Sequence, residues 1–206
     1  LQVAYSRSRG NARVLEHLVS DGQNLLLPSE ANKIIQLDEL LQRRISTALS
    51  EARRRGYQNE EIKIFLAGLA TLPPPVPVRD LALANKVAEG AINSFAADLA
   101  PLLEQTSHGL MFRDEPTETL LRRDYAADNV LLRRLADNLD AMQGSSEYAA
   151  ITLPDLLKQL DDGQRLVQLA FDERLPASIQ SAVGRQEIRQ ARLRAAIAHA
   201  TNPVSF

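Results

Sequence analysis

A tetrapeptide of two leucines and two arginines occurs twice in this chain, at residues 120–123 and 131–134. Eleven residues separate the copies, which is about three turns of an α-helix at roughly 3.6 residues per turn. A helix therefore places both leucine pairs on one face, whereas a strand would place them on opposite faces. The spacing predicts one long helix over residues 117–143, ended by the turn residues at 144–146. Its expected core face is Leu120, Ala127, Leu131, Leu135, Leu139 and Met142.

Two other stretches predict long helices. Over residues 29–55, Ser29 is a good N-cap, apolar residues recur every three or four positions, and Gly56 suits the left-handed position after a helix. Over residues 79–107, a stripe of leucines, alanines and a phenylalanine recurs at the same spacing, and Pro101 predicts a kink or break near Ala100. Shorter helices are expected over residues 59–72, 154–172 and 177–200.

Composition agrees with helices. Aromatic residues make up only 4% of the 206 residues, and there is no Trp. Strands favour aromatic and β-branched side chains, whereas Ala, Leu, Gln, Glu and Arg, which are abundant here, favour helices. The sequence therefore predicts an all-α fold, a bundle of six or seven helices, three of them long.

A proline-rich stretch, Pro73–Pro77, interrupts the helical pattern. Prolines at this density favour an extended polyproline conformation. We expect a linker at residues 73–78 between an N-terminal helical part (1–72) and a C-terminal helical part (79–206). Two alternatives remain open: a strap across one continuous domain, and a docking peptide for an aromatic groove.

The sequence shows no pattern typical of catalysis, cofactor binding or metal binding. There is no Cys, which excludes disulfides and thiol chemistry, and none of the common phosphate-loop, nucleophile-elbow or zinc-protease motifs is present. The three histidines, His17, His108 and His199, lie in different predicted elements. Adjacent carboxylates such as Asp161 and Asp162 diverge by about 100° on a helix, so they do not form a two-carboxylate site. We expect no enzyme activity, no cofactor and no metal.

Arginine outnumbers lysine by 20 to 4, which is typical of GC-rich, bacterial coding. The last predicted helix carries four arginines, and Glu187 is its only acidic residue. One interpretation is a solvated face paired with acids from another helix. The other is a contact for an acidic partner or a phosphate backbone, although no aromatic residue is interleaved and no helix-turn-helix signature stands out. The candidate partner-binding residues are Arg185, Arg189, Arg192 and Arg194.

These observations favour a non-catalytic helical module for protein–protein interaction, an adaptor or scaffold, which could belong to a bacterial secretion-associated protein or effector. Another protein or a second copy is the expected partner, and nucleic acid or an acidic partner bound through the arginine row is the alternative. No apolar run approaches the roughly 18 to 20 residues that span a bilayer. The first residue is Leu1, so we expect a fragment or processed chain, cytoplasmic or exported without a signal visible here.

Overall fold

The computed structural model describes residue 12, residues 37–126 and residues 128–201. It divides into two compact units, residues 1–55 and residues 56–206, which are described separately. The expected start of the helix over residues 29–55 and the histidine His17 lie outside the described residues.

In the first unit, α3 (Leu37–Arg54) is the described part of the helix predicted over residues 29–55. Two arginines occupy its last turn, where cations offset the partial negative charge of the helix end. Gly56 follows with a φ of +103°, a conformation that favours glycine, so the predicted end of this helix is confirmed. The buried members of the predicted stripe are Leu41, Ile45, Ala48 and Ala52.

The second unit begins with α4 (Asn59–Thr71), α5 (Val78–Asn85) and α6 (Glu89–Asp98), which precede an antiparallel hairpin of β1 (Leu103–Thr106) and β2 (Gly109–Phe112). These elements replace the single helix predicted over residues 79–107, and that prediction is wrong. The apolar stripe predicted a single helix because α5 and α6 each bury apolar residues at helical spacing, and the short turn between them does not interrupt that pattern.

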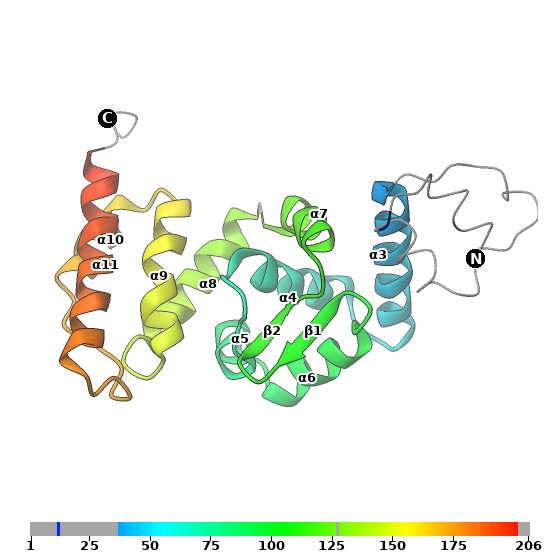
Figure 1. Ribbon diagram of the computed structural model, residues 1–206, viewed down its shortest axis with the longest axis horizontal. Helices are drawn as coiled ribbons and strands as arrows, with labels where there is room; N and C mark the ends of the chain where they lie inside the picture. Colours follow the sequence, from blue (N-terminus) through cyan, green and yellow to red (C-terminus); the bar gives the residue numbers. More distant parts are fainter. Residues whose placement is uncertain (1–11, 13–36, 127, 202–206) are drawn as a thin grey trace, which may run out of the picture. The chain divides into compact units, whose positions relative to one another are not determined.

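A left-handed residue ends α5. Lys86 has a φ of +57°, and its amide donates to the carbonyls of Ala82 and Leu83. The chain then turns at residues 86–88 and starts α6 at Glu89. α5 and α6 therefore form a helix–turn–helix, and the hairpin of β1 and β2 follows it in the chain (Figure 1).

The proline-rich stretch lies within the second unit. Val76 is fully buried and exchanges two backbone hydrogen bonds of 2.8 Å with Leu110 of β2. Gly109 has a φ of +145°, and a Cβ atom there would lie 2.3 Å from the carbonyl oxygen of Val76. This close approach requires glycine, and it places Val76 of the proline-rich stretch directly against β2 of the hairpin.

The remaining helices are α7 (Glu115–Tyr125), α8 (Asn129–Met142), α9 (Glu147–Gln159), α10 (Gly163–Ala170) and α11 (Ala182–Ala200). In Figure 1, α9, α10 and α11 lie together at one end of the second unit, and α8 connects them to α4 and α5, which it also contacts. Nine helices and one hairpin thus make up the described residues. The prediction of an all-α protein is confirmed in broad terms, with more helices than expected.

The helix predicted over residues 117–143 is two helices, α7 and α8, so its single-helix form is wrong. Asp128 starts α8 by accepting the amides of Val130 and Leu131, and its carboxylate also binds Lys63 of α4 at 2.6 Å. The two leucine pairs still point into the core, because two helices joined by a short turn can bury both. In the same way Ser146 caps α9, which leaves Pro154 inside that helix rather than in its first turn.

Candidate functional site

The four arginines of the predicted row lie on α11, but they do not share one surface. Arg185, Arg189 and Arg194 are exposed, whereas Arg192 is only 1% exposed. Arg192 is four residues from both Ile188 and Ala196, which are buried, so it shares their face of the helix. Arg192 follows Arg189 by three residues, which is about 300° around the helix. The two side chains therefore point about 60° apart, and only Arg192 faces the interior.

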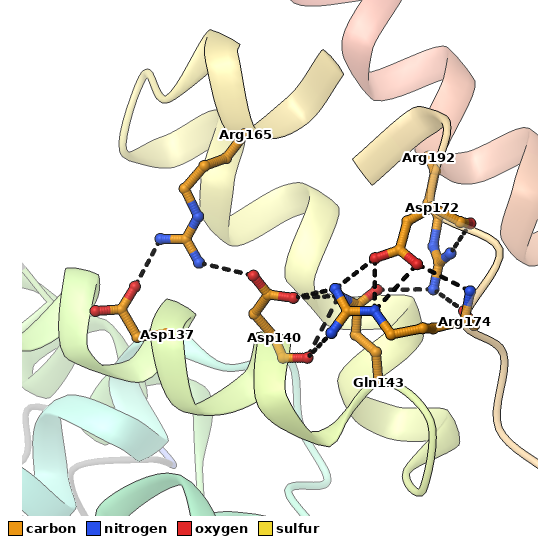
Figure 2. A network of polar contacts seen from close by, with 7 residues as sticks. All are labelled: Asp137, Asp140, Gln143, Arg165, Asp172, Arg174 and Arg192. Carbon is orange, nitrogen blue, oxygen red and sulfur yellow. Dashed lines mark hydrogen bonds and ion pairs between the residues drawn. The ribbon is translucent and has the colours of Figure 1, made fainter. Parts of the chain in front are cut away.

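The Arg192 guanidinium bonds only to neutral oxygens. It donates to the backbone carbonyls of Asp172 (2.8 Å) and Arg174 (2.9 Å) and to the side-chain oxygen of Gln143 (2.7 Å), as Figure 2 shows. Its Nε atom has no partner. Burial lowers the pKa of Arg192, although an arginine remains a cation in proteins. These hydrogen bonds therefore hold the segment after α10 against the end of α8.

A row of ion pairs extends from this buried cation along the end of α8 (Figure 2). Arg174 donates through Nε to Asp172 (2.8 Å) and through Nη2 to Asp140 (2.8 Å). Arg165 of α10 reaches Asp137 at 2.8 Å and Asp140 at 3.4 Å. The hydrogen bonds from Arg174 hold the pKa of the Asp172 carboxyl below its usual range. Each of these charged groups has a partner, so the cluster is a set of cross-links between α8, α10 and the segment that leads to α11.

An open pocket of about 350 Å³ lies beside this cluster, between the end of α10 and the exposed side of α11. We call it the Phe171 pocket. Arg189 is the one member of the predicted row that lines it. Arg185 and Arg194 are exposed elsewhere on α11, and Arg192 does not line it. Its lining residues are Ala170, Phe171, Asp172, Glu173, Gln186, Arg189, Gln190 and Leu193.

Two large exposed apolar side chains, Phe171 and Leu193, line the same pocket. Phe171 is 80% exposed, which is the highest value among the large apolar side chains of the described residues. Of the eight such side chains that are strongly exposed in the described residues, five lie on α10, on α11 or directly after α10. Helical spacing does not separate an exposed apolar residue from a core residue, so the sequence pattern alone predicts an apolar core stripe through Val183, Leu193 and Ile197, which the structure leaves exposed. The five are Val167, Phe171, Val183, Leu193 and Ile197.

Apolar residues and glutamines recur at helical spacing along the exposed side of α11. Positions three or four apart from Val183 to Ile197 fall on one face, opposite the face that buries Ile188 and Arg192. We use the name α10–α11 face for this surface together with Phe171. Its members are Phe171, Val183, Gln186, Gln190, Leu193 and Ile197.

A second, larger pocket of about 600 Å³ lies between α5 and α9. Two exposed apolar side chains, Leu83 and Ile151, line it. Ser146, which also lines it, does not have the arrangement of a nucleophile. Its hydroxyl donates to the carboxylate of Asp80 and accepts the amide of Ala149 as an N-cap, so no histidine base is bonded to it. These bonds join α5 to α9 and have a structural role.

The helix–turn–helix lacks the charge that nucleic-acid recognition requires. α6 would be its recognition helix, and it contains two acidic residues and no Lys or Arg. Over residues 56–113 there are four Lys and Arg against six Asp and Glu. Because phosphate contacts supply most of the affinity for DNA, this charge disfavours binding through α6.

The two described histidines have different surroundings. His199 lies in the last turn of α11, 3.3 Å from a carboxylate oxygen of Asp161, and its ring packs on Gly163. His108 is exposed in the turn of the hairpin and lines the pocket between α5 and α9. Within the described part of the chain, no three His, Asp or Glu side chains are grouped to hold a metal ion. None of the described helices has the length and apolar character to cross a membrane.

The chain matches no protein-family model and no curated protein. The geometry of the described residues is therefore the basis for any functional assignment.

Proposed function

We propose that this protein is a non-catalytic helical interaction module, an adaptor or scaffold, and that it binds a protein partner through the α10–α11 face. The observation that carries the proposal is the concentration of large exposed apolar side chains there, with Phe171 80% exposed. Removing such surface from water gains about 25 cal/mol for each Å². Clustered apolar surface on a folded protein usually marks a partner site.

The side chains present suit a protein partner. Aromatic residues and arginine contribute most often to the energetic centres of protein interfaces, and Phe171 and Arg189 line one pocket. Polar glutamines lie between the apolar members of the face, so the surface can form hydrogen bonds as well as apolar contacts.

Hydrogen bonds from a buried side chain support this face. Arg192, which is buried, bonds the carbonyls of Asp172 and Arg174, and these residues flank Glu173 in the pocket wall. A surface that is already ordered loses little conformational entropy when it binds. The narrower expectation of a bacterial secretion-associated or effector domain is supported only by composition: no cysteine, and helices rich in Ala, Leu and Arg.

The proposal is tested with a photo-crosslinking amino acid at Phe171 or at Leu193 of the full chain, expressed in the source cell. We expect discrete protein adducts at both positions. The matched control is Val130 on α8, which is 78% exposed but lies outside the face. Adducts at Val130 equal to those at Phe171, or no adducts at either position of the face, would contradict the proposal.

A second candidate is the binding of nucleic acid or another acidic partner through the exposed arginines of α11. The observation in its favour is that Arg189 lies beside the exposed Phe171, and a cation with an aromatic ring can bind a single strand. A labelled single-stranded oligonucleotide should bind with an affinity that falls steeply with salt, and the triple change R185A/R189A/R194A should abolish binding. The pair R133A/R134A on α8 is the control, and equal losses in both variants would exclude α11 as the site.

A further inference from the structure

We infer that the occupant of the α10–α11 face is a second copy of this chain, related by a two-fold axis. This inference rests on the proposed interaction function and names its partner. In a two-fold dimer the same patch meets itself, so the patch must be complementary to itself in both charge and shape. Two independent features of the face meet that requirement.

The first feature is a pair of opposite charges on one pocket. Glu173 and Arg189 both line the Phe171 pocket. Both side chains are exposed, and neither forms an ion pair with another described residue. The neighbouring Asp172 is already bound by Arg174, so it does not compete for Arg189. A second copy that presents the same pocket therefore offers Glu173 to Arg189 and Arg189 to Glu173.

The second feature is the order of side chains along α11. Gln190 is at the middle of the exposed face, and Val183 and Ile197 are equally distant from it on either side. When two α11 helices pack antiparallel about an axis near Gln190, Val183 of one copy lies opposite Ile197 of the other. The same symmetry places Gln186 opposite residues 193 and 194, of which Leu193 belongs to the face.

A two-fold axis near Gln190 also brings Glu173 of one copy close to Arg189 of the other. Arg189 adjoins Gln190, so the two copies of Arg189 lie near the axis and repel each other unless an acid is present. Glu173 from each copy supplies that acid, because it belongs to the same pocket as Arg189. Arg185 lies nearer the buried side of α11 and takes no part in this exchange, which makes it a matched control.

The inference is tested by exchanging the two charges and measuring the mass of the full chain by sedimentation velocity over a range of concentrations. We expect the wild type to dimerise. R189E alone places two acids together and E173R alone places two bases together, so each should weaken dimerisation about tenfold or more. The double variant E173R/R189E should restore it. R185E should dimerise as the wild type does.

Mixing E173R with R189E tests the pairing of the two charges most directly. E173R carries only positive charge at this site and R189E only negative charge, so an equimolar mixture should form a heterodimer although each alone is monomeric. Circular dichroism melting shows that each variant is folded. A wild type that stays monomeric at about 100 μM, or single variants that dimerise unchanged, would overturn the inference.

This failure is distinct from failure of the proposed function. A monomeric wild type whose Phe171 crosslinks to other proteins would leave the interaction function intact and remove the second copy as its partner. An absence of any adduct at Phe171 would remove both.

Discussion

Arg192 is a buried side chain that joins two segments of the chain, although the sequence predicted it to be a surface contact. Its two terminal nitrogens hold carbonyl oxygens from the segment after α10 and from Gln143 at the end of α8. Buried polar groups are costly when they lose their partners, at about 1–3 kcal/mol for each unsatisfied group. The residue therefore decides the path of the chain between α10 and α11.

We predict that Arg192→Met destabilises the protein by about 3 kcal/mol or more, because it leaves one buried and two partly buried carbonyl oxygens without their donor. The measurement is urea unfolding followed by circular dichroism. Arg185→Met is the matched control, since Arg185 is an exposed arginine of the same helix outside the proposed dimer contact, and its effect should stay within about 0.5 kcal/mol. Equal effects of the two changes would show that the Arg192 contacts carry no stability.

Asp172 gives a prediction about pH. Hydrogen bonds from Arg174 lower the pKa of Asp172 in the folded protein, so ionised Asp172 stabilises the fold above its unfolded pKa of about 4. That contribution is lost as the pH falls through the lower, folded pKa. We expect Asp172→Asn to lower the melting temperature at pH 7, and the difference from the wild type to shrink as the pH approaches about 2. Asp155→Asn, an exposed change on α9, should show no such trend.

At the scale of elements, side-chain caps set where the helices begin, and glycines set where they end or pack closely. Asp128, Ser146 and Ser181 each accept an amide in the first turn of α8, α9 and α11. Such caps contribute about 1 kcal/mol each, enough to choose between one long helix and two short ones when both bury the same leucines. The packing of α10 against α11 depends in addition on a glycine.

Gly163 at the start of α10 allows α11 to come close. A Cβ atom there would lie 2.1 Å from Nε2 of His199, which itself pairs with Asp161. We predict that Gly163→Ala lowers the melting temperature, because the His199 ring must move and the last turn of α11 moves with it. Gly90→Ala is the control, since a Cβ at Gly90 meets nothing within 4 Å. A Gly163 variant as stable as the Gly90 variant would contradict this close contact.

At the scale of the whole molecule, the boundary between the two compact units falls at Arg55. Three exposed arginines, at positions 53–55, lie there. We predict that limited trypsin digestion releases a stable fragment that begins at Gly56, because a protease needs exposed chain at the edge of a compact unit. Mass spectrometry of the digest identifies the cut.

The control for this digestion lies within the same chain. Arg133 and Arg134 are also exposed, but they are in the middle of α8, whose backbone is held by helical hydrogen bonds and by packing against α4, α5 and α9. Cleavage after these residues should be much slower. Cleavage there as fast as at residues 53–55 would contradict the two-unit division.

The sequence by itself determined that this chain is mainly helical and which side of α3, α7 and α8 is buried. Helical spacing depends only on neighbours along the chain, so the burial of Leu120, Leu131 and Ile45 and the helix end at Gly56 were predictable. The turns inside apparent long helices were not, because a two-helix corner preserves the same apolar spacing. The asparagine–lysine pair at 85–86 and Asp128 were the available signals, and both are weak without a known core.

The tertiary structure alone decided which of the α11 arginines lies inside and which borders a pocket. Arg192 and Arg189 are the same residue type three positions apart on one helix. The spacing of Ile188 and Ala196 places Arg192 on their face, but this spacing does not by itself bury an arginine. What separates them is the path of residues 171–181, which brings two backbone carbonyls over Arg192 and leaves Arg189 beside the exposed Phe171. That path is set by contacts between residues distant in the chain, and such contacts form only when the helices pack together.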